Sequence, residues 1–189
     1  MIRPEKTYCP NILTVSGTGR KVGKTTLACS IIKMMRGKGK VTGVKISPHF
    51  HDVDYENSIA EKSGAYAVYQ EDRMDRGKDS SQMLAAGADK VYYVQTNDQN
   101  LRDAWEQLSE LLDKDAPVII ESGRIHELVR PGLSLLLIHP EKYNEEMNPK
   151  KAESHPDFAE VILEEENFEP VISRISYVDG NWILKEKYD

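Results

Sequence analysis

The chain has 189 residues, enough for one globular domain that buries its own core without disulfides or a structural metal. Apolar residues make up 39% and charged residues 30% of it, a balance typical of folded rather than disordered chains. Its net charge of −6 argues against nucleic acid or a membrane surface as the main partner. No apolar run approaches the roughly 20 residues that cross a bilayer.

Two features bear on the compartment. Arg3, Glu5 and Lys6 interrupt any apolar run near the start, so no signal peptide is expected. The chain has two cysteines, Cys9 and Cys29, which are expected to be ordinary reduced thiols. The sequence therefore predicts a cytoplasmic protein.

The first motif lies between two apolar segments. Residues 12–16 predict a buried strand, and residues 24–36 predict a helix with its apolar side chains on one face. Residues 17–25 between them read Gly-Thr-Gly-Arg-Lys-Val-Gly-Lys-Thr. A strand, a glycine-rich loop and a helix in this order are the context of a phosphate-binding loop, or P-loop. The sequence therefore predicts that a nucleoside triphosphate is held here.

The residue types of this loop suit that chemistry. Glycines let the backbone turn tightly and direct successive N–H groups inward, and the start of the helix adds a partial positive charge. Lys24 would reach the terminal phosphates, and the Thr25 hydroxyl would bind Mg²⁺. The residues expected to bind the nucleotide are Gly17, Thr18, Gly19, Lys21, Val22, Gly23, Lys24, Thr25 and Thr26.

The spacing of the loop departs from the standard pattern. That pattern is glycine, four residues and then Gly-Lys-Ser/Thr, and counting back from Gly23 gives Thr18 in place of the first glycine. Gly17 lies one residue earlier, so the loop is a longer variant. The alternative is a surface loop that contains Gly-Lys-Thr by coincidence.

The rest of the chain alternates strands and helices as far as residue 138. Helices are expected at residues 80–86, capped by Asp79 or Ser80 and ended by Gly87, and at residues 101–112. The expected strands are residues 41–46, 65–70, 91–94, 118–121 and 135–138. Apolar runs that alternate with helices predict an α/β fold, a three-layer P-loop NTPase with a mostly parallel sheet and helices on both faces.

The C-terminal part has a different pattern. Residues 141–156 are polar and loop-like, and residues 157–163 fit a helix or a strand. Residues 171–178 and 182–185 flank Asp179-Gly180, which predicts an antiparallel hairpin. We expect residues 1–189 to form a single nucleotide-binding domain, with residues 141–189 as a C-terminal extension that includes the hairpin.

Chemistry in such folds gathers at the carboxyl ends of the strands. Lys45 ends the second expected strand, where it can neutralise a bound anion or simply face solvent. A metal site from His49, His51, Asp52 and Asp54 is conceivable, although loop histidines more often bind substrate or nothing.

A second group follows the apolar run of residues 118–120. Glu121 lies at its end, where nucleotide enzymes place a carboxylate beside Mg²⁺, and the alternative is an exposed acid at a strand end. Residues 77–80, Gly-Lys-Asp-Ser, open the next short helix, whose N–H groups together with Lys78 could hold an anion. An ordinary capped helix start explains them equally well.

These observations define the expected site. Lys24, Lys45 and Glu121 are the expected catalytic residues. The expected Mg²⁺ ligands are Thr25, Glu121 and Asp52. The bound nucleotide is GTP or ATP, because no Asn-Lys-x-Asp motif for guanine occurs in the chain.

The order of these motifs resembles the MobB-type molybdopterin-guanine dinucleotide biosynthesis adapter proteins over roughly residues 10–125. The shared features are residues 23–27, Val44-Lys45 with His-Phe-His-Asp after it, residues 77–80 leading to Ala-Gly-Ala, and the later acidic strand end. The resemblance implies a cytoplasmic GTP-binding homodimer that assists a partner protein in molybdenum-cofactor synthesis. It implies slow GTP hydrolysis, if any. The chain departs from the family in having Ile-Glu-Ser-Gly at residues 120–123 and His-Phe-His in place of adjacent histidines.

The loop is also similar to that of dethiobiotin and cobyrinate amide synthetases, which share the spacing from Gly17 to Thr25 and a lysine after the second strand. That resemblance implies an ATP-dependent enzyme that phosphorylates a small carboxylate. A third alternative is a degenerate P-loop protein that binds a partner and no nucleotide. The intact Lys24-Thr25 pair argues against this alternative.

Overall fold

The computed structural model describes residues 6–19, 21–50, 53, 55, 58–138, 160–163 and 167–186, with the backbone alone at 160–163. The strands are β1 (Thr7–Gly17), β2 (Thr42–Ser47), β3 (Ala60–Lys62), β4 (Tyr66–Gln70), β5 (Lys90–Thr96), β6 (Val118–Glu121), β7 (Val129–Ile138), β8 (Glu160–Leu163), β9 (Ile175–Val178) and β10 (Asn181–Leu184). The helices are α1 (Lys24–Met35), α2 (Asp79–Ala86), α3 (Leu101–Leu111), the 3₁₀ turn η1 (Ile125–Glu127) and α5 (Glu169–Ile172).

The main sheet has the strand order β3-β4-β5-β2-β6-β1-β7-β8. All neighbouring pairs from β5 to β8 are parallel, while β3 and β4 add an antiparallel edge. The predicted α/β class with a mostly parallel sheet is therefore confirmed. Strand β3 was not predicted, because Ala60–Lys62 is short and its two charged residues are exposed.

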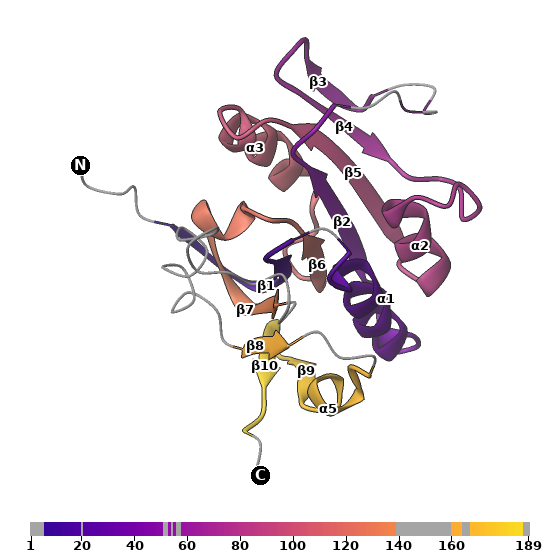
Figure 1. Ribbon diagram of the computed structural model, residues 1–189, viewed down its shortest axis with the longest axis vertical. Helices are drawn as coiled ribbons and strands as arrows, with labels where there is room; N and C mark the ends of the chain where they lie inside the picture. Colours follow the sequence, from indigo (N-terminus) through magenta and orange to yellow (C-terminus); the bar gives the residue numbers. More distant parts are fainter. Residues whose placement is uncertain are drawn as a thin grey trace.

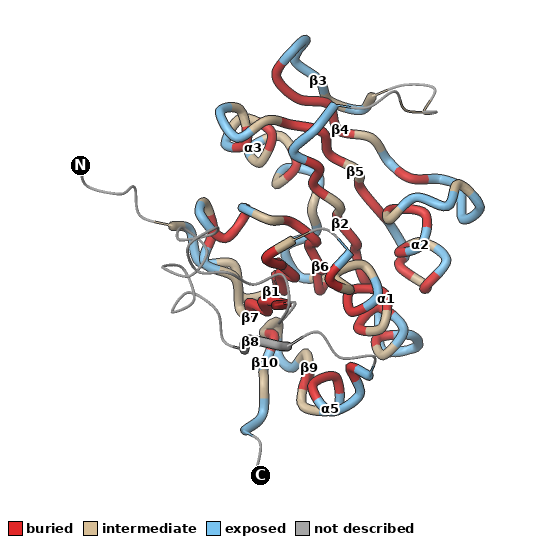
Figure 2. Tube along the Cα trace, in the orientation of Figure 1, coloured by how far each residue is buried: buried red, intermediate tan, exposed pale blue. Residues whose placement is uncertain are grey.

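Helices cover both faces of this sheet (Figure 1). Leu13 and Ile119 face α1 and α2, whereas Ile12 and Ile120, one residue away on the same strands, face α3. This alternation is the period of two that a β-strand imposes on its side chains. Because both faces are covered, the central strands are largely buried (Figure 2), which explains their continuous apolar runs.

The C-terminal hairpin is confirmed and forms a second, two-stranded sheet of β9 and β10. Its turn has Asp179 at φ 50° and Gly180 at φ 78°, the left-handed pair that two-residue hairpin turns require. Trp182 is buried against the main sheet, and its Nε1–H donates to the Asn11 carbonyl oxygen at 2.9 Å. The hairpin therefore belongs to the same core as β1 and α1.

Three local predictions differ from the structure. The strand expected over residues 171–178 begins as helix α5, because Pro170 suits the first turn of a helix and cannot donate to a sheet. Helix α2 is capped by neither Asp79 nor Ser80 but by Lys78, whose backbone N–H bonds Ser81 Oγ at 3.0 Å. Strand β1 starts five residues earlier than expected, because it pairs with β7 across a register shift after Cys9.

Among the described residues, no helix has both the length and the apolar character needed to cross a membrane.

The Trp182 contact provides a stability test. Replacing Trp182 with Ala removes a buried aromatic side chain and its hydrogen bond, so we expect a loss of about 3–5 kcal/mol in the free energy of unfolding. The matched control is Ile183→Ala, the next residue along the strand, whose side chain is 42% exposed and should cost far less. Urea denaturation measures both variants. Equal, small losses would contradict the packing of the hairpin onto the core.

Candidate functional site

Three parallel strands bring the expected site residues to one edge of the sheet. In the register of β1, β6 and β2, Glu121 lies opposite Val15 on one side and opposite Lys45 on the other. The loop that follows β1 leads directly into α1. Loops from the carboxyl ends of β1, β2 and β6 therefore meet at one place, as they do in ligand-binding α/β sheets.

The described residues of the glycine-rich loop, 17–19 and 21–25, pack closely on one another. Val22 is fully buried, and a Cβ at position 17 would approach its Cγ2 to 2.6 Å, so only glycine fits there. Gly23 precedes α1 with φ 89°, a conformation that other residues rarely adopt. Lys24 Nζ donates to the Gly19 carbonyl oxygen at 2.6 Å. The side chain of Lys24 therefore reaches back to the loop that precedes it.

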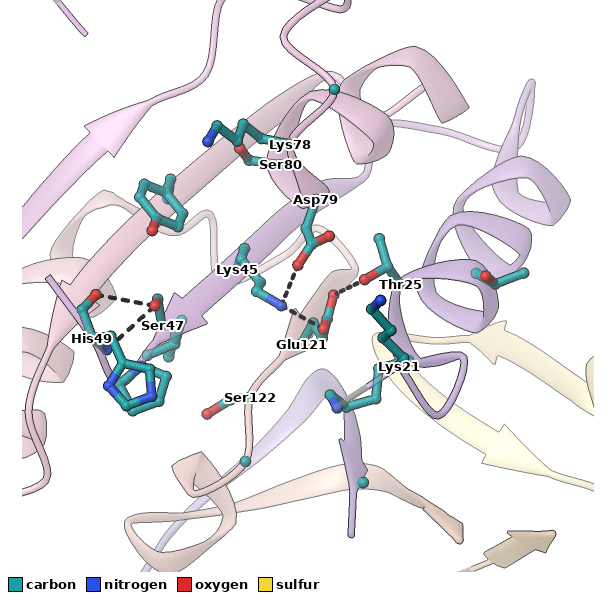
Figure 3. Close-up of a pocket in the computed structure, with 18 of the residues that line it drawn as sticks. Lys21, Thr25, Lys45, Ser47, His49, Lys78, Asp79, Ser80, Glu121 and Ser122 are labelled. Atoms are coloured by element: carbon teal, nitrogen blue, oxygen red, sulfur yellow. Dashed lines mark hydrogen bonds and ion pairs between the residues drawn. The ribbon is translucent and has the colours of Figure 1, made fainter. Parts of the chain in front are cut away.

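Glu121 is the centre of a polar network at this edge (Figure 3). Its carboxylate is almost completely buried and accepts hydrogen bonds from Lys45 Nζ at 2.5 Å and from Thr25 Oγ1 at 2.9 Å. Lys45 Nζ also lies 2.6 Å from Asp79 Oδ2, in the first turn of α2. One ammonium group thus joins a strand carboxylate to a helix carboxylate, and the same strand carboxylate holds the start of α1.

The charges of this network affect one another. Burial by itself lowers the pKa of Lys45, but the neighbouring Glu121 carboxylate and the hydrogen bond to Asp79 outweigh burial and raise it above 10.5. Lys45 is therefore a cation at neutral pH. Burial, with Glu121 nearby, raises the pKa of the Cys29 thiol to about 11, so Cys29 is a neutral thiol rather than a nucleophile.

A cavity of about 1180 Å³ opens in front of these groups. Its walls include residues 21–26, 45–49, 76–80 and 121–123, together with Gly17 and Gly19. Small-molecule sites usually enclose about 300–1,000 Å³, so this cavity is larger than most of them. Every described residue expected to bind nucleotide contributes to its lining except Thr18, which is buried and whose N–H donates to the Leu137 carbonyl oxygen.

The loop after Lys45 is only partly described. His49 lines the cavity, and its backbone N–H donates to Ser47 Oγ at 3.3 Å. His51, Asp52 and Asp54 lie outside the described residues, and with them most of the conceivable metal site and the third expected Mg²⁺ ligand. Within the part of the chain that is described, no three His, Cys, Asp or Glu side chains form a metal-binding group.

Sequence reasoning missed two features of the site. Asp79 was expected only to open a helix, whereas its carboxylate is the second partner of Lys45. Glu71, buried just after β4, accepts a hydrogen bond from the Tyr55 hydroxyl at 2.7 Å and was not singled out at all. The only signal for Asp79 was its place beside Lys78 at a helix start, and Glu71 gave no signal in the sequence.

Comparisons with protein-family models, with curated proteins and with solved structures found no significant match to this chain. The buried carboxylate and the neighbouring hydroxyl offer oxygen ligands for a cation. The glycine-rich loop at the helix start and the ammonium group offer donors for an anion.

The Lys45–Glu121 pair predicts a pH-dependent stability difference. Lys45→Met leaves Glu121 buried without its cation, which should cost about 3 kcal/mol at pH 7. Because pairing raises the pKa of Lys45, its contribution is complete below pH 10.5 and is lost as the pH rises through the higher folded value. The difference in unfolding free energy between wild type and Lys45→Met should therefore shrink above pH 10.5.

Denaturant titrations of both proteins at neutral and alkaline pH measure this difference. The exposed Lys40, as Lys40→Met, provides a control that should change stability little at either pH. A Lys45→Met variant as stable as wild type at pH 7 would contradict the pairing.

Proposed function

We propose that this chain is a P-loop protein that binds a Mg²⁺–nucleoside triphosphate in the cavity at the carboxyl edge of the sheet. The observation that carries the proposal is the 2.9 Å hydrogen bond between Thr25 Oγ1 and Glu121 Oε2. It joins the last residue of a glycine-rich loop to a carboxylate at the end of an adjacent parallel strand. In nucleotide-binding sites of this type those two groups flank the metal and the terminal phosphates.

The residues present suit Mg²⁺. The ion prefers oxygen ligands and keeps several waters, so a hydroxyl and a carboxylate are a sufficient protein contribution. Thr25 and Glu121 would hold it, with Asp52 as the third expected ligand. When bound, Mg²⁺ neutralises charge on the phosphates. To bind Mg²⁺, Thr25 and Glu121 would have to break the hydrogen bond between them.

The chain's own cations would hold the phosphates. Lys24 would exchange the Gly19 carbonyl oxygen for phosphate oxygens, which are stronger acceptors because they are charged. Lys21 lines the same cavity and has an exposed side chain. Lys45 pairs with both Glu121 and Asp79 and would balance one of their two negative charges beside the nucleotide. The catalytic roles of Lys24, Lys45 and Glu121 are parts of this proposal.

For the biological role we propose a cytoplasmic, homodimeric GTP-binding adapter in molybdenum-cofactor synthesis. The support is the order of motifs shared with the MobB-type proteins, in which Lys45 and Asp79 belong to separate motifs. Their side chains lie 2.6 Å apart in this structure. In such an adapter the output is conformational, with loops near the nucleotide ordered by its terminal phosphate.

One observation favours a second candidate, an ATP-dependent enzyme that phosphorylates a small carboxylate. The cavity continues beyond the glycine-rich loop to Arg73, Arg76 and Lys78, which leaves room for a second ligand. Positioning of the two ligands and neutralisation of charge by Lys21 and Lys45 would then supply the acceleration.

Nucleotide binding is tested by Lys24→Ala. We expect the wild type to bind Mg²⁺ with GTP or ATP and the variant to bind about 100-fold more weakly, a loss of about 2.7 kcal/mol. Isothermal titration calorimetry measures both affinities. Lys33→Ala is the matched control, because Lys33 lies on the same helix with its side chain exposed. If Lys24→Ala and Lys33→Ala bind as wild type does, the P-loop proposal fails.

Base preference separates the two candidate roles. The adapter should be stabilised against heat by GTP and its non-hydrolysable analogues with Mg²⁺, and should release little phosphate. The carboxylate-activating enzyme should instead be stabilised selectively by ATP. Thermal-shift assays with both nucleotides, followed by phosphate release, distinguish them. Selective stabilisation by ATP would exclude the GTP-binding adapter.

A further inference from the structure

The glycine-rich loop rests on an apolar floor to which the C-terminal part of the chain contributes. Val22 of the loop is fully buried in one core cluster with Leu137, at the end of β7, and Phe168, the residue before α5. A Cβ built on Gly23 would lie 3.0 Å from Phe168 Cζ and 3.5 Å from Leu137 Cδ2. The Phe168 ring therefore lies directly against the last glycine before α1.

Phe168 is held in this position by the elements that follow it. Its side chain is buried, and its carbonyl oxygen accepts the N–H groups of Val171 and Ile172 at 3.1 and 3.0 Å, which fixes the residue at the start of α5. Helix α5 contacts α1 and lies beside the hairpin (Figure 1). The hairpin is anchored in turn to β1 by the hydrogen bond from Trp182 to Asn11. Helix α5 and the hairpin therefore keep the ring beneath the loop.

The loop needs such support because part of its backbone has an unfavourable conformation. Lys21 has φ 58° and Gly23 has φ 89°, both in the left-handed region. A lysine rarely adopts that region and keeps it only where surrounding contacts impose it. Successive N–H groups converge on a phosphate only while the backbone holds this shape. Without the ring beneath Gly23, ligand binding would have to order the loop, which weakens affinity.

We propose that Phe168 is a positioning residue of the nucleotide site, so that residues 167–186 are a working part of that site rather than a separate extension. The inference rests on the proposed function, because it concerns the loop assigned to the triphosphate. Phe168 does not line the cavity, so it acts on the ligand only through Gly23 and the backbone of the loop. Because such coupling is reciprocal, a nucleotide that orders the loop also stabilises the packing of α5 against it.

The first test is calorimetry with Mg²⁺ and a non-hydrolysable GTP or ATP analogue, at a temperature where circular dichroism shows each variant to be folded. Phe168→Ala should bind at least about tenfold more weakly than wild type. Phe168→Leu keeps most of the apolar volume and should restore most of the affinity. The matched control is Ile172→Ala, because Ile172 is buried in the same cluster but is not among the nearest neighbours of Gly23. It should lose stability and bind as wild type does.

Hydrogen exchange of the wild type provides a second measurement, which does not depend on the folding of a variant. Mg²⁺ with the nucleotide analogue should slow exchange of the Val171 and Ile172 amides in α5. The amide of Leu108 in α3 provides the reference, because α3 packs on the opposite face of the sheet. We expect the slowing to be larger in α5 than in α3.

Two outcomes overturn the inference. One is a folded Phe168→Ala that binds as wild type or loses no more affinity than Ile172→Ala. The other is exchange in α5 that the nucleotide slows no more than exchange in α3. Failure of the proposed function gives a different result, because the wild type itself then binds neither nucleotide. If Lys24→Ala weakens binding and Phe168→Ala does not, the P-loop proposal stands and Phe168 is only a core residue.

Discussion

The buried carboxylate of Glu121 is the constraint on which the rest of this site depends. A charge with almost no exposure to water is costly unless it is paired and hydrogen-bonded. Lys45 and Thr25 satisfy it, and through Lys45 it also holds Asp79. The network therefore ties together the starts of α1 and α2 and the ends of β2 and β6, so the cavity is shaped by the same contacts that balance its charges.

Much of the fold could be predicted from the sequence because its signals are local. Apolar runs bounded by polar turns located β2 and β6, and Asp179-Gly180 located the hairpin turn. The failures came where tertiary pairing decides the outcome. The early start of β1 depends on β7, more than a hundred residues away, and the short charged strand β3 forms only because β4 is beside it. Strand β7 lies far outside a local window around β1, whereas β4 follows β3 closely but leaves no strand pattern in Ala60–Lys62 itself.

The candidate site was predictable where a motif fixes a spacing. Gly17, Gly19, residues 21–25, Lys45 and Glu121 follow from their places at strand ends, and the structure brings them to one cavity. Asp79, Glu71 and Arg76 could not be placed in this way, because their roles arise from contacts between different elements. Glu71 and Arg76 lie in a charged segment that resembles a solvated loop, yet both are largely buried. Burial of charge is a property of the assembled fold rather than of the local sequence.

The central claim is that Thr25 and Glu121 together hold the metal of a bound nucleotide. Mn²⁺ can replace Mg²⁺ at such oxygen sites and is observed directly by electron paramagnetic resonance. Titration of Mn²⁺ with a non-hydrolysable nucleotide analogue should show a bound ion only when the chain and nucleotide are both present. Thr25→Val and Glu121→Gln should weaken it roughly 10-fold or more, whereas Glu110→Gln, an exposed acid on α3, should not. A bound ion unaffected by either substitution, or no bound ion in the wild type, would contradict the account.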